Sequence, residues 1–162
     1  MKIKKETPVL FVRISDYKKY NYVEEHKKVL DKNGYVWLLK IGKKSNEDFV
    51  KKVLENGGGL IIKSTAKHGH NFYYCTFTTN KVDDSLLYPD YYNEIFNDEY
   101  YDLEELKKSC SWFKIEKMIP LSEEQVKKFV VIKTRRNLLE CGTMFRVNQM
   151  YLEADEDIII NE

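Results

Sequence analysis

The chain has 162 residues, with 27 basic and 26 acidic side chains and 43% hydrophobic residues. This length favours one domain with a hydrophobic core, and an aromatic content of 14% argues against a disordered chain. No apolar run reaches the ~18 residues of a membrane span, and the N-terminal residues do not resemble a signal peptide. Cys75, Cys110 and Cys141 are too far apart for a zinc ribbon or a disulfide framework. We therefore expect a cytoplasmic protein with reduced thiols and no membrane contact.

The first half of the chain predicts strands that are separated by helices. The β-branched run at 9–14 predicts a buried strand, and Gly34 is the expected C-cap of the helix that follows. Ser45 is the expected N-cap of a second helix, with Asp48 at the capping-box position. Further strands are expected at 35–41, 60–65 and 71–79, the last two joined as a hairpin through 66–70.

The second half predicts fewer regular elements. Residues 80–101 are expected to be irregular, with a short helix after Asp102. Ser122 and Gln125 have the spacing of a capping box, which predicts another short helix. Strands are expected at 111–119, 129–132 and 144–150, with a helix at 134–140. Because strands and helices do not alternate regularly, we predict an α+β fold: a small, curved, mainly antiparallel β-barrel with flanking helices, in a single domain covering residues 1–162.

The near-zero net charge hides a strong segregation of charge. Residues 83–106 contain nine acidic and no basic side chains, and residues 153–162 add five more acids. The other 128 residues hold all 27 basic side chains against twelve acids. Such a basic body attracts polyanions, although many of its lysines can equally be solvated faces of helices. We expect an acidic, Tyr-rich insert at about 83–105 and an acidic C-terminal tail.

Motifs for catalysis and metal binding are weak. The glycines at 57–59 follow a predicted helix and precede a strand, which is the reverse of a phosphate-binding loop. His68 and His70 have no further ligands at a familiar metal-site spacing, and Cys75 lies in the middle of a predicted strand. The sequence therefore predicts no catalytic residue, no metal and no cofactor, and we expect a protein that is not an enzyme.

The aromatic residues are the stronger signal, with twelve Tyr, eight Phe and two Trp. Aromatic faces beside cations can hold an unstacked base while Lys and Arg hold the phosphates. A strand aromatic is more often part of the core, yet we expect at least one of Trp37 and Trp112 to line a pocket.

Three short stretches resemble a known superfamily. The helix at 26–30 and the strand Gly34-Tyr35-Val36-Trp37 are similar to a helix and "G-x-V-W" strand of some PUA-like domains, the superfamily that includes the EVE, ASCH and YTH branches. The stretch Ser111-Trp112-Phe113-Lys114-Ile115 resembles a late barrel strand of these domains, and 133–147 resembles their closing helix and strand. The insert at 83–105 and the lack of a full YTH aromatic cage are departures.

The resemblance implies nucleic-acid binding, with a modified base held in an aromatic pocket whose wall includes Trp37 and Trp112. Some such domains stand at the front of modification-dependent restriction enzymes. We therefore expect a module that binds DNA or RNA and reads a modified or flipped base, either alone or with a larger restriction or defence enzyme. The candidate binding residues are Trp37, Lys40, Lys63, Ser64, Lys67, His68, Tyr73, Trp112, Lys133, Arg135 and Arg136.

A second hypothesis is an interaction or inhibitor protein, such as a phage-encoded antagonist of a host defence system. Its acidic strip would imitate nucleic acid and bind a basic partner through tyrosines, which are good interface anchors. The candidate residues are Tyr88, Tyr91, Tyr92, Tyr100 and Tyr101. Hydrolysis of RNA or of a nucleotide is a third possibility without a motif behind it.

Overall fold

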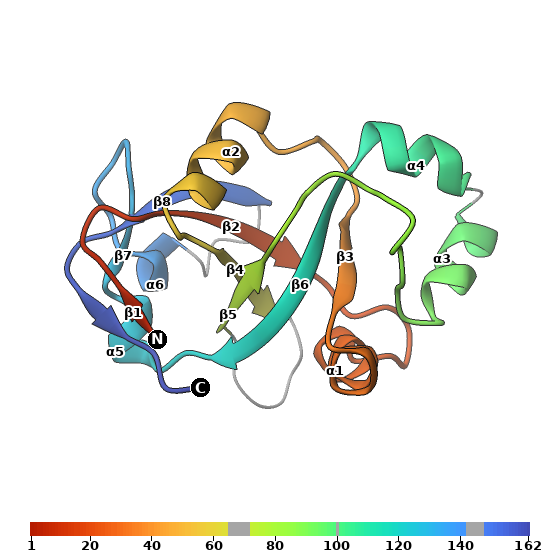
Figure 1. Ribbon diagram of the computed structural model, residues 1–162, viewed down its shortest axis with the longest axis horizontal. Coiled ribbons are helices and arrows are strands. Elements are labelled where there is room, and N and C mark those ends of the chain that lie inside the picture. Colours follow the sequence, from red (N-terminus) through yellow and green to blue (C-terminus); the bar gives the residue numbers. More distant parts are fainter. Residues whose placement is uncertain (65–71, 100, 142–147) are drawn as a thin grey trace.

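A curved sheet with helices on both sides forms the body of the protein (Figure 1). The computed structural model describes residues 1–64, 72–99, 101–141 and 148–162. The strands are β1 (Lys2–Ile3), β2 (Pro8–Ile14), β3 (Val36–Lys40), β4 (Leu60–Ser64), β5 (Phe72–Phe77), β6 (Ser111–Pro120), β7 (Phe129–Val131), β8 (Gln149–Ala154) and β9 (Ile158–Ile159). The helices are α1 (Tyr22–Asn33), α2 (Glu47–Glu55), α3 (Tyr92–Asp98), α4 (Leu103–Ser109), α5 (Glu123–Val126) and α6 (Leu138–Cys141).

Seven strands pair in the order β3-β6-β5-β4-β2-β8-β7, and β2 and β4 are the one parallel pair among them. The expected α+β class and mainly antiparallel sheet are confirmed. The sheet is not closed, because β3 and β7 remain as its two edges, so a barrel is not observed. The N–H of Trp37 on edge strand β3 donates to the carbonyl of Leu87 (2.8 Å), and the segment before α3 thus covers part of that edge.

The helices on either side of β3 illustrate one correct cap and one incorrect cap. Gly34 ends α1 in the left-handed conformation, with φ of 80°, as predicted. The N-cap of α2 is Asn46 rather than Ser45, and its side chain accepts a hydrogen bond from the backbone N–H of Phe49. Ser45 is buried instead, where its N–H donates to Ser111 Oγ (2.8 Å) and its hydroxyl bonds to Gln149 Oε1 (2.9 Å). Ser45 thereby links the loop after β3 to both β6 and β8.

The region expected to be irregular contains a helix. Within residues 80–101, α3 runs from Tyr92 to Asp98 and packs its Tyr92 ring beside Trp112, with ring centroids 6.4 Å apart. No side chain caps its N-terminus, so the usual sequence signal for a helix start is missing. The predicted helix after Asp102 is confirmed as α4, and the Ser122–Gln125 capping box is confirmed at α5.

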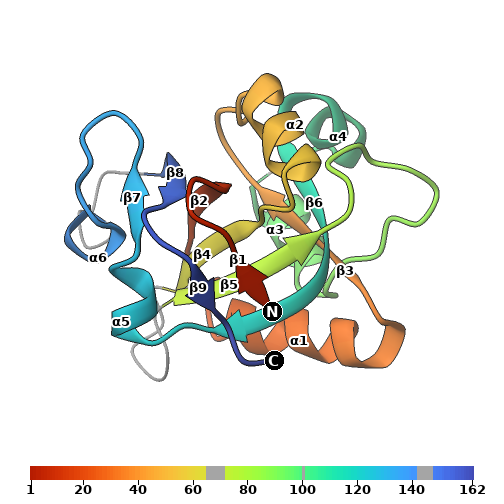
Figure 2. The ribbon, with the colours of Figure 1, turned by 60° about the vertical axis from the view of Figure 1, so that its left-hand side comes forward.

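The C-terminal prediction was partly wrong. The strand expected at 144–150 is β8 at Gln149–Ala154, and residues 142–147 lie outside the described part of the chain. The expected helix at 134–140 is reduced to α6 at Leu138–Cys141. The acidic tail is folded, because Ile158–Ile159 forms β9 and pairs with β1. Both chain ends lie side by side in the two views (Figures 1 and 2).

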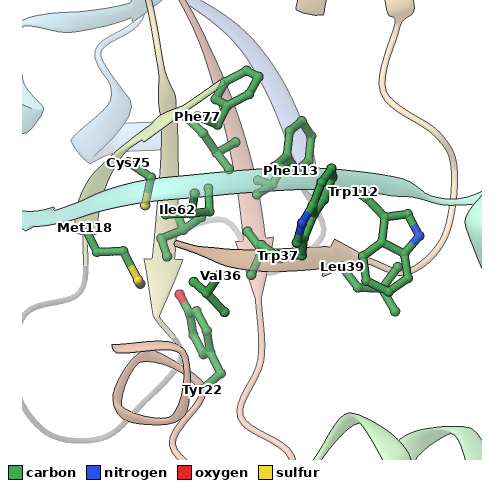
Figure 3. Packing of buried hydrophobic residues seen from close by; sticks show 14 of the residues in the cluster. Tyr22, Val36, Trp37, Leu39, Ile62, Cys75, Phe77, Trp112, Phe113 and Met118 are labelled. Carbon is green, nitrogen blue, oxygen red and sulfur yellow. The ribbon is translucent and has the colours of Figure 1, made fainter. Parts of the chain in front are cut away.

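The sheet separates two hydrophobic clusters. Leu10 and Val12 of β2 face one cluster, while the alternate residues Val9 and Phe11 face the other, as the two-residue repeat of a strand requires. The first cluster contains Trp37 and side chains of both α1 and α2. These two helices lie on opposite sides of the molecule (Figures 1 and 2). The close-up in Figure 3 shows its side chains packed around β3 and β6.

Candidate functional site

Both indoles belong to the core, which corrects the expectation that one of them lines a pocket. Trp37 is 0% exposed and Trp112 is 1% exposed, and Figure 3 shows them among packed side chains. Their ring nitrogens donate to the carbonyls of Ser85 (3.2 Å) and Leu106 (3.1 Å). The segment between β5 and β6 folds over these rings, so neither can stack on a base without opening the core.

The tyrosine strip is also less exposed than the interaction hypothesis requires. Tyr91 and Tyr92 are 4% and 2% exposed, and Tyr88 is half-buried with its ring stacked on Tyr92 at 5.4 Å between centroids. Tyr101 is exposed, and Tyr100 lies outside the described residues. Three of the five candidate tyrosines therefore pack inside the protein instead of forming an open docking surface.

The predicted basic residues lie in separate places. Lys63 and Tyr73 are half-buried on the paired strands β4 and β5, but Lys63 is opposite Phe72 and Tyr73 is opposite Ile62, so their side chains lie on opposite faces of the sheet. Ser64 ends β4. Lys67 and His68 lie outside the described residues. Lys40 is buried at the end of β3, whereas Lys133, Arg135 and Arg136 are exposed between β7 and α6.

Arg135 bonds to Glu153 and to Asp155 (3.0 Å) beside β8, so two carboxylates partly neutralise this exposed group. The hydrogen bond that Arg135 donates to Glu153 is the main reason that the pKa of Arg135 is raised. Because Arg135 is paired with carboxylates of the protein itself, it is a weaker candidate for contact with a ligand.

A pocket of about 320 Å³ lies where β2 and β3 end. One wall consists of residues 13–17, which are the last two residues of β2 and the three that follow them. Residues 39–41 at the end of β3 form another wall. Tyr91, Tyr92 and Ile95 complete the pocket from the region of α3. Small-molecule pockets in proteins hold about 300–1,000 Å³, so this volume suits a ligand of about nucleotide size.

The loop after β2 is fastened to α3. Lys18 has a left-handed backbone with φ of 51°, within a tight turn closed by hydrogen bonds between the backbones of Tyr17 and Tyr20. The Tyr17 hydroxyl donates to Asp98 Oδ2 (2.7 Å), and the Lys18 ammonium pairs with the same carboxylate oxygen. The rings of Tyr17 and Tyr20 stack on Tyr91, with centroids 6.4 and 5.4 Å apart. One carboxylate thus joins two walls of the pocket.

The link to Asp98 gives a testable pH dependence. Hydrogen bonds from Lys18 and then Tyr17 lower the pKa of Asp98 below its ordinary 3.8, and the bond to Asp98 raises the pKa of Tyr17 to about 12. Because the folded-state pKa of Asp98 is depressed, the link stabilises the protein above the ordinary pKa and is lost as pH falls through the lowered one. We expect Lys18→Gln to raise the pKa of Asp98 towards 3.8, measured by ¹³C NMR titration of the carboxyl group. Lys28→Gln on the exposed face of α1 is the control, and an Asp98 pKa that is the same in both variants would contradict the link.

A buried hydrogen-bond network fixes the back of the pocket. The Leu39 N–H donates to the Tyr92 hydroxyl (3.0 Å), and that hydroxyl donates to Nε2 of His26 (2.6 Å). Nδ1–H of His26 donates to the Tyr22 carbonyl (2.7 Å), which sets the tautomer. Burial lowers the pKa of His26 to about 4, so the ring is neutral at pH 7 and holds Tyr92 in one position. This wall is rigid.

Two cations, Lys40 and Arg13, line this pocket. Arg13 is the direct cross-strand partner of Lys63 in the parallel β2–β4 pair. Desolvation, and then the charge of Arg13, lower the pKa of Lys63. The two positive charges therefore lie close together where β2 and β4 end. Lys40 and Lys63 were predicted as site residues, and the structure associates them through Arg13.

Sequence reasoning missed Arg13, Tyr17 and Ile41 as site residues, and it named Tyr101 only for the interaction hypothesis. A signal for Arg13 was present, because it is the one charged residue in the otherwise apolar run at 9–14. Ile41 and Tyr101 are 41% and 38% exposed, and both line the pocket. They are two of four large hydrophobic side chains exposed in the described part of the chain. A concave site with an apolar exposed rim is a typical binding site.

No family model, curated protein or solved structure matches this chain. In the described ranges, none of the helices has the length and apolarity needed to cross a bilayer. Over the same ranges, His, Cys, Asp and Glu side chains form no group of three that could hold a metal ion. The pocket must therefore be interpreted from its own chemistry.

Proposed function

We propose that the protein binds single-stranded nucleic acid, or an extruded nucleotide of a duplex, and holds one base in the pocket between β2, β3 and α3. The observation that carries the proposal is a pocket of about 320 Å³ with Lys40 and Arg13 on its walls. The rings of Tyr17 and Tyr101 are its more exposed aromatic surfaces, beside the buried Tyr91 and Tyr92. Tyrosine rings replace the stacking that a base loses when it leaves its neighbours, and cations beside them hold phosphates. The pocket replaces the two indoles as the base-binding element of the original hypothesis.

The path of the backbone follows from the arrangement of the cations. Arg13 and Lys63 lie side by side at the ends of β2 and β4, next to the pocket. Tyr101 and Ile41 offer exposed apolar surface at the same pocket, against which a neighbouring base or ribose can pack. A single strand that enters the pocket with one base therefore meets both an apolar contact and positive charge.

A relationship to PUA-like domains is part of this proposal. Its support is the sequence resemblance at 26–40, 111–115 and 133–147. Under this proposal the bound base can carry a modification, and the pocket rather than either indole discriminates it.

Replacing Tyr17 by alanine tests the pocket. Base–aromatic stacking contributes about 1–3 kcal/mol per base, so we expect Tyr17→Ala to weaken oligonucleotide binding roughly five- to hundredfold. Binding is measured by fluorescence anisotropy with a panel of single- and double-stranded, methylated and unmethylated oligonucleotides. The matched control is Tyr35→Ala, because Tyr35 is also half-buried but its hydroxyl bonds to Ser85 away from the pocket.

Equal affinities for the two alanine variants would exclude the pocket as the base site. No binding of any oligonucleotide at 50 mM salt would refute the proposed function itself.

Binding of a protein partner is the second candidate function. Because most of the candidate tyrosines are packed inside the protein, its support is the negative charge of the segment at 83–105 alone. Eight acids between 83 and 105 are exposed, namely Asp83, Asp84, Asp90, Asp98, Glu99, Asp102, Glu104 and Glu105. Deleting 83–105 would remove Tyr92 from the core and unfold the protein, so it is not a useful test. Charge reversal of Glu104 and Glu105 on α4 keeps the fold, and loss of a basic partner with oligonucleotide binding intact would favour this function.

A further inference from the structure

Lys40 is a buried cation without a carboxylate partner. The residue is only 5% exposed, and it lines the pocket at the end of β3. Its Nζ donates to the carbonyl of Lys43 (2.6 Å). Within the described part of the chain, no Asp or Glu oxygen lies at ion-pair distance from it, whereas other lysines such as Lys18 and Lys44 have such partners.

Removing an ammonium group from water costs free energy, which a single neutral carbonyl does not repay. Burial accordingly lowers the pKa of Lys40 from its ordinary 10.5. An anionic group that enters the pocket would supply the missing counter-charge, and a low-dielectric site strengthens that attraction.

The other charged groups at the pocket are more exposed than Lys40. Glu99 is exposed, and Asp16 is half-buried with Oδ1 accepting from the backbone N–H of Tyr22 (3.0 Å). Arg13 is also half-buried. The carboxylates are therefore better screened by water than Lys40, which is the most buried of the charged residues that line the pocket.

We propose that Lys40 is a phosphate anchor, so that the pocket binds a whole nucleotide, its phosphate at Nζ and its base against the tyrosines. This inference rests on the proposed function and names its ligand class. A free nucleoside monophosphate then binds without any further nucleic acid, and it binds more tightly than the nucleoside that lacks the phosphate.

The experiment compares the four nucleosides, their 5′- and 3′-monophosphates and inorganic phosphate by isothermal titration calorimetry at pH 7. Hydrogen bonds to a charged group contribute about 1.5–3 kcal/mol, so we expect roughly a ten- to hundredfold gain from the phosphate. Lys40→Met removes the charge and keeps the length of the side chain, and it should erase this gain. Lys43→Met is the control, because that exposed side chain is three residues away and its carbonyl remains in place.

The Lys40→Met variant should fold, because exchanging a buried charge for an apolar group of similar size is often neutral or stabilising. Its Tm should be equal to or above that of the wild type. For the wild type, nucleotide affinity should fall as pH rises through the lowered pKa of Lys40, while nucleoside affinity does not follow that titration.

Equal affinities of nucleosides and nucleotides for the wild-type protein, both reduced by Tyr17→Ala, would overturn the phosphate anchor and leave the proposed function standing. A phosphate-dependent gain that survives in Lys40→Met would assign the anchor to another residue and also overturn the inference. If neither mononucleotides nor oligonucleotides bind, both the inference and the proposed function are wrong.

Discussion

Replacing Arg13 and Lys63 together by glutamine is expected to weaken single-stranded oligonucleotide binding about tenfold or more at 50 mM salt. The two cations are direct neighbours across β2 and β4, and Arg13 lines the pocket, so the double variant removes positive charge where the backbone should run. Each lost phosphate contact should also reduce the slope of log affinity against log salt by about 0.7 for a single strand.

The measurement is fluorescence anisotropy over a salt series from 50 to 200 mM. Lys32→Gln with Lys52→Gln is the matched control, because both lysines are exposed near the ends of helices α1 and α2 and the net charge changes equally. If the control loses as much affinity and slope as the test variant, binding follows net charge and not the β2–β4 cation pair.

Replacing Trp112 by alanine should destabilise the fold by about 3–5 kcal/mol, the usual range for a buried Trp truncation. The ring is 1% exposed, its nitrogen bonds to the Leu106 carbonyl, and its centroid lies 6.2 Å from Tyr88 and 6.4 Å from Tyr92. Because 1 kcal/mol lowers Tm by about 2–4 °C in a chain of this size, we expect a fall of about 6–20 °C in thermal unfolding followed by circular dichroism.

Tyr101→Ala is the comparison for Trp112→Ala. That ring is 38% exposed, and surface substitutions usually change stability by about 0.5 kcal/mol or less. A Trp112→Ala protein with unchanged Tm that had lost only nucleotide binding would restore the indole as a ligand contact and contradict its role in the core.

The strands were predictable from the sequence because each is a local pattern of apolar and β-branched residues. Such a pattern shows that Trp112 shares a face with particular neighbours, but it does not show what covers that face. The cover here is α3, which begins without a side-chain cap in a segment rich in acids and tyrosines and therefore has no local helix signal. Because the sequence did not predict α3, Trp37, Trp112, Tyr91 and Tyr92 were expected to be more exposed than they are.

The pocket was beyond sequence reasoning for a related reason. It joins the end of β2 to the end of β3 and to α3, and Asp98 links to Tyr17 across 81 positions in the chain. Lys40 was selected as one of several cations beside aromatics, yet its burial depends on the loop at 41–45 and on curvature of the sheet. Propensity describes neither of these long-range features.

The pairing of β1 with β9 determines how the fold would respond to a pulling force. The strands are antiparallel, and Met1 bonds to Ile160 where both chain ends leave the pair. Tension applied between the two ends would act on one pair of opposite residues at a time. The strands would therefore separate pair by pair at low force, instead of all their hydrogen bonds breaking together. Lys2 and Ile159 would separate before Ile3 and Ile158. Only then would tension reach the backbone hydrogen bond from Glu6 to Ala154, the last residue of β8 in the seven-stranded sheet.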